Sequence, residues 1–193
     1  MNTPSHAILN LALLGKAKFP QYNLLIAFGG IAPDIPIFLF YGWAKLIAKL
    51  PESQIWSEAY YEPGWQTFIA LSHSIPLATI ILILAYWIDW QWLQLFCLSL
   101  ICHSLLDLPV HHDDAHRHFF PFSNYRFNSP FSYWDVNHYG VWVSLVEMLL
   151  VIAATYYYWG NITSWFGKGT MLFVNIAYVV LWFLFYFRYW IQA

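Results

Sequence analysis

The sequence predicts an all-α protein, a polytopic bundle of helices embedded in a membrane. Of its 193 residues, 60% are hydrophobic and 9% are charged, whereas soluble domains carry about 25% charged residues. Four apolar segments reach the roughly 20 residues that a membrane-spanning helix needs; they cover 67–88, 91–110, 139–159 and 169–190. No polar linker divides the chain, so we expect residues 1–193 to form a single integral membrane domain.

The N-terminal third predicts shorter elements. Thr3 or Ser5 can cap a helix that ends at Leu14, and residues 15–20 read as a turn. The following apolar run, 24–32, stops at Pro33-Asp34-Ile35-Pro36. Each arm is too short to span, so we expect a short helical hairpin covered by protein. An apolar helix over about 36–50 and a polar, acidic loop over 51–66 complete this region.

The spans 67–88 and 91–110 are joined by a very short turn at 89–91, so they form an antiparallel hairpin. The start of the first and the end of the second then lie on the same side of the membrane. The polar loop 111–137 leaves from that side, and the span 139–159 begins there. Trp and Tyr residues crowd the span ends, as is typical of membrane–water interfaces. The last span, 169–190, is predicted from the same two features, its apolar length and the aromatic residues at its end.

Ionisable residues inside these helices are predicted to meet at one depth. At 1.5 Å rise per residue, His73 lies about 9 Å, His103 about 10 Å and Asp107 about 5 Å from that side. Glu147 lies roughly 13 Å inside its own span. Ionisable groups in spans are costly and therefore indicate function. With the open end of the hairpin included, the converging residues are His6, Asp34, His73, His103, Asp107 and Glu147.

Imidazole and carboxylate are ligands of zinc and related metals, but each residue also has a simpler interpretation. His103 and Asp107 share a helix face, where they can bind one metal or hydrogen-bond each other. His73 is either a ligand or a packed core histidine. Asp34 is either a ligand or the N-cap of the next helix, and His6 is either a ligand or an exposed terminal residue.

The loop 111–118 is rich in further candidates. His112 and His116 have the spacing of two ligands on one helical turn, with His111, Asp113, Asp114 and His118 as alternatives. Arg117 can hold an anionic substrate or contribute ordinary interfacial charge. Glu147 is a candidate ligand, general base or arginine partner. The net charge of −2 lacks the excess of basic residues that is typical of nucleic-acid-binding proteins. No nucleotide-binding motif is present.

The order and spacing of these motifs resemble a known family. The set comprises His6, Ala32-Pro33-Asp34, Ser72-His73-Ser74, His103-x3-Asp107 and Pro121-Phe122-Ser123. It resembles the LexA-regulated inner-membrane metal-dependent hydrolases, which are similar in turn to the zinc-dependent phospholipase C and nuclease superfamily. The resemblance implies metal ligands at His6, Asp34, His73, His103 and Asp107. The H-x3-E pair of the soluble members is absent here, so one or two zinc ions are expected rather than three.

We therefore expect a membrane-bound metal-dependent hydrolase in a prokaryotic inner membrane, acting as a phosphoesterase on a lipid or lipid-linked substrate. Its predicted catalytic residues are Asp34, Glu147 and Arg117, and its predicted metal ligands are His6, Asp34, His73, His103, Asp107, His112 and His116. A non-enzymatic metal-binding or structural membrane protein is the alternative. A membrane di-iron oxygenase is a weaker one, because the clustered H-x-x-H-H boxes of that class are missing.

Overall fold

The computed structural model describes residues 1–16 and 18–191. Every regular element in these ranges is a helix, which confirms the all-α prediction. Five helical segments are long and apolar enough to cross a membrane, one more than the sequence predicts. They are Pro20–Ile47, Pro63–Trp87, Gln91–Val110, Gly140–Asn161 and Trp165–Phe185.

Four of these segments correspond to the predicted spans. The first contains α5 (Pro63–Ser72) and α6 (Ile75–Trp87), which are separated by a break at His73 and Ser74. The others contain α7 (Gln91–Asp107), α8 (Gly140–Tyr158) and α9 (Trp165–Phe185), and the short α10 (Phe187–Trp190) follows. α9 begins four residues before the prediction because Ser164 caps it, accepting a hydrogen bond from the Gly167 amide.

The additional span corrects the prediction of a short hairpin arm. α2 (Asn23–Ile31) continues through a 3-10 turn (Ala32–Asp34) into α3 (Ile35–Gly42) and a π-helical turn (Trp43–Ile47). The predicted stop at 33–36 is wrong because both prolines lie in first-turn positions of these elements. A proline there lacks an N–H that would have no helical partner anyway.

The segment 51–66, predicted to be a loop, also contains helical structure. α4 (Glu52–Ser57) and a 3-10 turn (Ala59–Tyr61) fold back onto α3. Ile55 of α4 is fully buried against Phe40 of α3, and this contact explains why a polar sequence stays ordered. Glu52 in the first turn of α4 complements the helix dipole.

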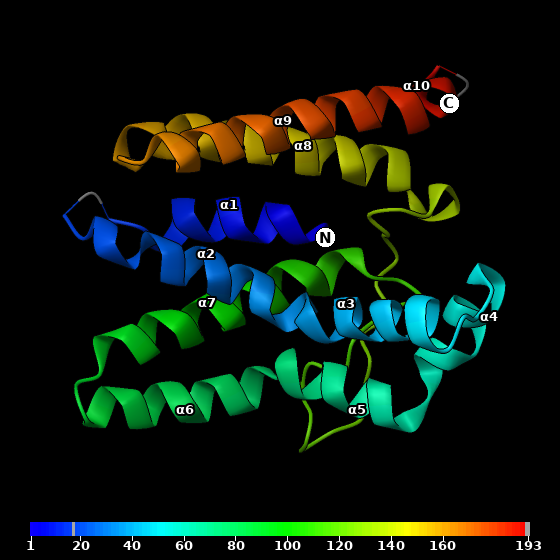
Figure 1. The fold of residues 1–193 in the computed structure, drawn as a ribbon, viewed down its shortest axis with the longest axis horizontal. Helices are drawn as coiled ribbons and strands as arrows, with labels where there is room; N and C mark the ends of the chain where they lie inside the picture. The colour runs from blue at the N-terminus through cyan, green and yellow to red at the C-terminus, as the bar shows by residue number, and fades with distance from the viewer. Residues whose placement is uncertain (17, 192–193) are drawn as a thin grey trace.

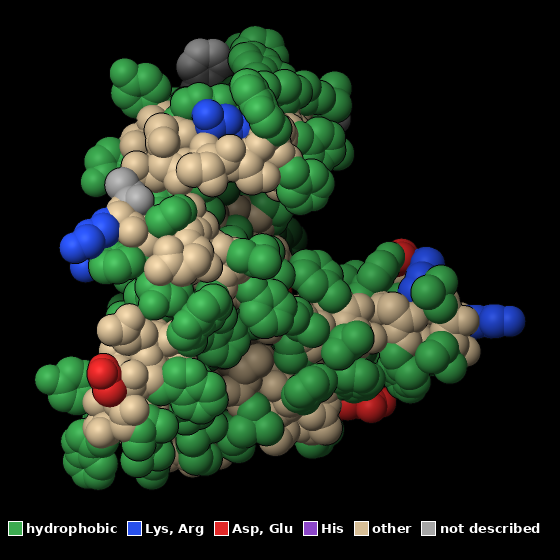
Figure 2. Space-filling model, turned by 60° about the vertical axis from the view of Figure 1, so that its left-hand side comes forward, with side chains coloured by type: hydrophobic (Ala, Val, Ile, Leu, Met, Phe, Trp, Pro, Cys, Tyr) green, Lys and Arg blue, Asp and Glu red, His purple; other side chains and the backbone are tan. Residues whose placement is uncertain are grey.

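α1 (Thr3–Leu14) is the short central helix of the bundle and contacts α2, α7 and α8 (Figure 1). Polar contacts join three of these helices at mid-depth. The Asn10 side chain of α1 donates to Ser99 Oγ of α7 at 2.8 Å, and Ser99 Oγ donates to the Ile26 carbonyl of α2 at 2.7 Å. The outer surface is apolar, and Figure 2 shows one face covered mostly by hydrophobic side chains.

The spans divide the connecting segments between two ends of the bundle (Figure 1). The turn end holds the α6–α7 turn at 88–90 and the α8–α9 turn at 162–164, and the loop end holds α4, the segment 111–139 and α10. The predicted antiparallel pairing of the spans around residue 89 is confirmed by the packing of α6 on α7.

Gly30 lies where α2 closely approaches the backbone of α1. A Cβ atom placed on it would lie 2.9 Å from the carbonyl carbon and oxygen of His6. We expect Gly30→Ala to push the helices apart and to destabilise the protein by about 1–3 kcal/mol, measured as a lower unfolding temperature in detergent. Gly42→Ala is the matched control, because a Cβ there meets nothing within 4 Å. Equal unfolding temperatures for the two variants would contradict this packing.

The topology is tested with single cysteines at Gln91 and Asn124 in a background of Cys97→Ala and Cys102→Ala. We expect a membrane-impermeant thiol reagent to reach these two positions from opposite sides. Labelling of both from one side would refute the five-span arrangement. The cations divide unequally between the two ends. The segments of the loop end carry Lys45, Lys49, Arg117, Arg126 and Arg188, and the turn end carries Lys16, Lys18 and Lys168.

Candidate metal centre

α7 supplies the base of the candidate site. His103, Asp107 and His111 follow one another at four-residue spacing, so their side chains lie on one side of the helix end. All three are buried, and Asp107 is 1% exposed. Asp107 Oδ1 lies 3.1 Å from His111 Nε2, and Asp107 Oδ2 lies 3.1 Å from His103 Nε2. The predicted pair of His103 and Asp107 thus forms the centre of a larger cluster.

His73 reaches the same cluster because the helix breaks beside it. α5 ends at Ser72, and Ser74 caps α6 by accepting a hydrogen bond from the Leu77 amide, so His73 lies between the two helices. Ser72 Oγ donates to the Pro33 carbonyl at 2.8 Å, and Ser104 Oγ donates to the His73 carbonyl at 2.9 Å. The three serines therefore fix the backbone on either side of the imidazole, which is fully buried.

The structure decides between the two interpretations of Asp34. Asp34 occupies the N-cap position of α3, but its side chain makes no capping hydrogen bond. Oδ2 instead accepts a 2.6 Å hydrogen bond from Thr3 Oγ1, and Oδ1 lies 3.5 Å from His73 Nε2 and 3.7 Å from His103 Nε2. The carboxylate thus faces the cluster rather than the helix end.

His6 is buried in the cluster and is not an exposed terminal residue. Its ring stacks on His103 with centroids 3.8 Å apart, and its Nε2 lies 2.9 Å from Asp107 Oδ1. The amino group of Met1 lies 2.5 Å from the same oxygen. α1 therefore contributes its first turns to the site, as the hairpin interpretation of the sequence predicts.

One group of potential ligands consists of Asp34, His73, His103 and Asp107, whose ligand atoms all lie within 4.8 Å of one another. The four imidazole–carboxylate distances are 3.1, 3.5, 3.7 and 3.9 Å. Most of them are too long for hydrogen bonds. A tetrahedral zinc ion with bonds of about 2.0–2.1 Å holds its ligand atoms about 3.3 Å apart. The spacing therefore suits a shared metal ion better than direct pairing.

Two of these histidines are oriented as metal ligands usually are. His73 Nδ1 bonds the Ile69 carbonyl at 2.9 Å, and His103 Nδ1 bonds the Gly30 carbonyl at 2.8 Å. A carbonyl only accepts, so Nδ1 carries the proton in both rings. In the neutral ring, Nε2 then offers a lone pair to the cluster, and neither Nε2 has a hydrogen-bond partner in the described structure. Backbone carbonyls commonly orient ligand histidines in this way.

A second group consists of Asp107, His111 and His116, which places Asp107 in both groups. The His116 ring lies 4.1 Å from that of His73 and 5.0 Å from that of His111. Burial and the nearby His73 lower the pKa of His116 well below its usual value, so its imidazole is neutral. Burial also lowers the pKa of His118 to about 4. Neutral imidazoles are the form that binds metals.

The predicted pairing of His112 with His116 on one helical turn is wrong, because the segment 111–118 is not helical. His112 points away from both groups. Its ring stacks on His138 at 3.6 Å, and its Nδ1 bonds the Ser129 carbonyl at 2.5 Å. His111 takes the inward position instead, and its four-residue spacing from Asp107 was the signal that could have indicated this.

Glu147 and Arg117, the other predicted catalytic residues, lie outside both groups. Glu147 Oε1 accepts hydrogen bonds from the Asn2 amide at 2.9 Å and from Ser5 Oγ at 2.5 Å, so it anchors the start of α1 on α8. The Arg117 guanidinium contacts Asn124 and Thr67 and lies over the Phe120 ring. The structure therefore gives Glu147 a positioning role and places Arg117 beside the loop rather than at the cluster.

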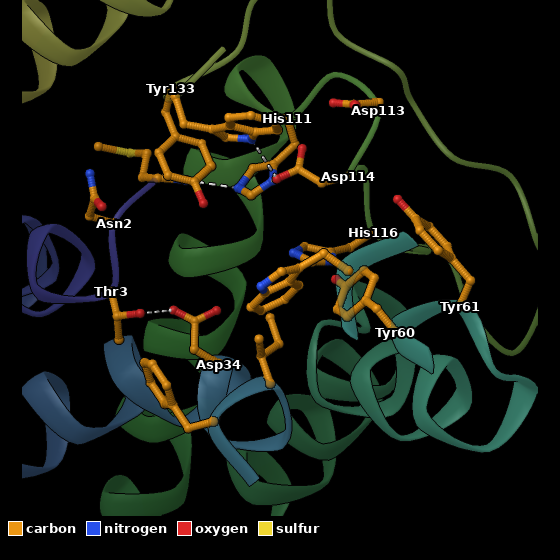
Figure 3. A pocket seen from close by; sticks show the side chains of 15 residues that line it. Asn2, Thr3, Asp34, Tyr60, Tyr61, His111, Asp113, Asp114, His116 and Tyr133 are labelled. Atoms are coloured by element: carbon orange, nitrogen blue, oxygen red, sulfur yellow. Dashed lines mark hydrogen bonds and ion pairs between the residues drawn. The ribbon is translucent and has the colours of Figure 1, made fainter. Parts of the chain in front are cut away.

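A pocket of about 690 Å³ opens from the cluster at the loop end. Asp34, His111 and His116 line its floor and point toward a common space (Figure 3). Asp114 Oδ2 lies 3.0 Å from His111 Nδ1, on the side of the ring opposite Asp107. The sequence did not indicate the aromatic wall, which comes from three separate segments: Phe38, Trp56, Tyr60, Tyr61, Tyr133 and Trp134.

Comparison of the chain with family models, curated proteins and solved structures finds no match. The fold and the cluster nevertheless establish two properties of the protein. The chain has helices that can cross a membrane, and its buried histidines and aspartates can hold a metal ion.

The anchoring role of Glu147 is tested by two substitutions. We expect Glu147→Gln to keep the bound metal, because an amide oxygen still accepts from Asn2 and Ser5. Glu147→Ala leaves these donors unpaired and should destabilise the protein by about 1–3 kcal/mol. The measurements are metal content and unfolding temperature in detergent. Loss of metal from folded Glu147→Gln would instead identify Glu147 as a ligand, as the sequence alone allows.

Proposed function

We propose that this chain is a membrane-embedded metal-dependent hydrolase that cleaves a phosphoester bond in a lipid or lipid-linked substrate. One observation carries the proposal: two ligand groups share Asp107, and both contribute residues to a single pocket at the end of the membrane spans. A purely structural ion would need closed coordination, whereas catalytic sites keep a position open to substrate.

Zinc is the metal that the donor set suits best. Imidazole nitrogens and carboxylate oxygens are common zinc ligands, and none of the residues in the two groups is a cysteine. A shared carboxylate is compatible with two ions about 3.5–4 Å apart, as found in two-metal phosphoesterases. We therefore propose one or two zinc ions. Asp34, His73, His103 and Asp107 would hold the first, and Asp107, His111 and His116 would hold the second.

The zinc ions, when bound, would lower the pKa of a water molecule and polarise a phosphoryl oxygen. The chain's own residues supply orientation. Thr3 holds one oxygen of Asp34, which leaves the other oxygen facing the cluster as a ligand or as a general base. Asp114 fixes His111, and the aromatic wall restricts the access of water.

The surroundings of the pocket support a lipid substrate. Trp56, Tyr61 and Trp134 line the pocket and are between 44% and 47% exposed, as suits side chains in the membrane–water interface. Neither lysine nor arginine is among the described residues that line it, so the metal site would provide the positive charge for the phosphate. From the motif resemblance, we infer a prokaryotic inner membrane as the location.

Elemental analysis of purified, folded protein tests the metal site. We expect one or two zinc ions per chain in the wild type. Asp107→Asn should lose all of the metal because both groups need this carboxylate. His116→Ala should lose only the ion of the second group, and His103→Ala the ion of the first. His112→Ala should keep its metal, since that ring lies outside both groups.

Hydrolysis of a panel of phosphoesters tests the reaction. We expect activity in the wild type and His112→Ala, and none in Asp107→Asn. Folded wild-type protein without stoichiometric metal would refute the metal centre. Stoichiometric metal without cleavage of any phosphoester, lipid or soluble, would refute the hydrolase and leave a metal-binding membrane protein.

A further inference from the structure

A second hollow of the molecule adjoins the metal centre but belongs to the membrane-embedded part. It is an apolar groove of about 440 Å³ between the end of α7 and the first half of α8. Its walls include Leu106 and Val110 from the α7 end and Trp142, Val143, Val146 and Leu150 from α8. Among the described residues that line it, Glu147 alone is acidic, and its Oε1 accepts hydrogen bonds from Asn2 and Ser5 at the start of α1. The groove therefore suits an apolar occupant.

The groove and the metal pocket meet at the start of α1. Met1 lines both of them. On the α7 side, Leu106 and Val110 are the immediate neighbours of Asp107 and His111, which belong to the two ligand groups. A molecule that fills the groove up to Met1 therefore ends beside the metal centre.

The length of the groove indicates what kind of apolar group it fits. Its residues on α8 run from Trp142 to Leu150, which corresponds to about 12 Å along the helix. One leaflet of a bilayer is about 15 Å thick, half of the roughly 30 Å hydrocarbon core. The groove thus covers most of one leaflet, as suits an acyl chain that enters from the interface, and both its walls belong to spans.

We propose that this groove holds one acyl chain of a phospholipid whose phosphoester lies at the metal centre. This inference rests on the proposed function and specifies its substrate as an acyl-bearing lipid taken directly from the bilayer. The chemistry of the two hollows is complementary to such an amphiphile. The metal ligands would face the phosphate of the lipid, and the apolar groove between the spans would face its acyl chain.

Photo-crosslinking tests the proposal without relying on catalysis. The probe is a phospholipid with a diazirine near the end of one acyl chain, reconstituted with the protein in vesicles. We expect mass spectrometry to locate cross-links on the groove residues of α8. The same diazirine on a diacylglycerol, which has no phosphate, should label these residues several-fold less because it lacks the group that anchors at the metal centre.

Two substitutions on α8 provide a matched pair. Val146 and Leu149 are each 54% exposed, but only Val146 lines the groove. We expect Val146→Trp to fill the groove and to reduce phospholipid labelling several-fold. Leu149→Trp should label like the wild type.

The outcomes separate this inference from the proposed function. Equal labelling by both probes, unchanged in Val146→Trp, would identify ordinary surrounding lipid and overturn the inference, even if soluble phosphoesters are hydrolysed. Phosphate-dependent labelling that Val146→Trp reduces supports the groove as a lipid site, even if no hydrolysis is found and the proposed reaction fails.

Discussion

The cost of burying Asp107 is the constraint on which the rest of the structure depends. A carboxylate removed from water costs several kcal/mol unless positive or donor groups surround it. Here the compensating nitrogens come from separate parts of the chain: His6 on α1, His103 within α7 and His111 after it. The bundle therefore has to bring these segments to one point. The amino group of Met1 lies on the same carboxylate, and a divalent ion in this place would add further positive charge beside it.

α1 meets this constraint without crossing the membrane itself. It lies among α2, α7 and α8, and polar contacts hold it at three levels: Thr3 on Asp34, Ser5 on Glu147 and Asn10 on Ser99. Each of these groups would be costly in lipid, and each finds its partner on a different helix. Gly30 allows α1 to approach α2 closely enough for its carbonyl to orient His103. Packing and ligand geometry are therefore set by the same contacts.

Much of this could be predicted from the sequence, because span length and helical rise are properties of local sequence. The depth of His73, His103 and Asp107 followed from the short turn at 89–91 alone. The rest depends on tertiary contacts. The chain continues through Pro33 and Pro36 because both prolines sit in first turns, which residue type does not reveal. The backbone after α7 is not helical, and it turns His111 rather than His112 toward the cluster. The aromatic wall joins segments about 80 residues apart in the sequence.

The central position of α1 also constrains how the protein is made. α1 has 12 residues, fewer than the roughly 20 that a span needs, and its polar side chains pair with α7 and α8, which are synthesised much later. The contacts of Ser5 with α8 and of Asn10 with α7 therefore cannot form until those helices have been synthesised. Closure of the bundle around it is a late step in assembly.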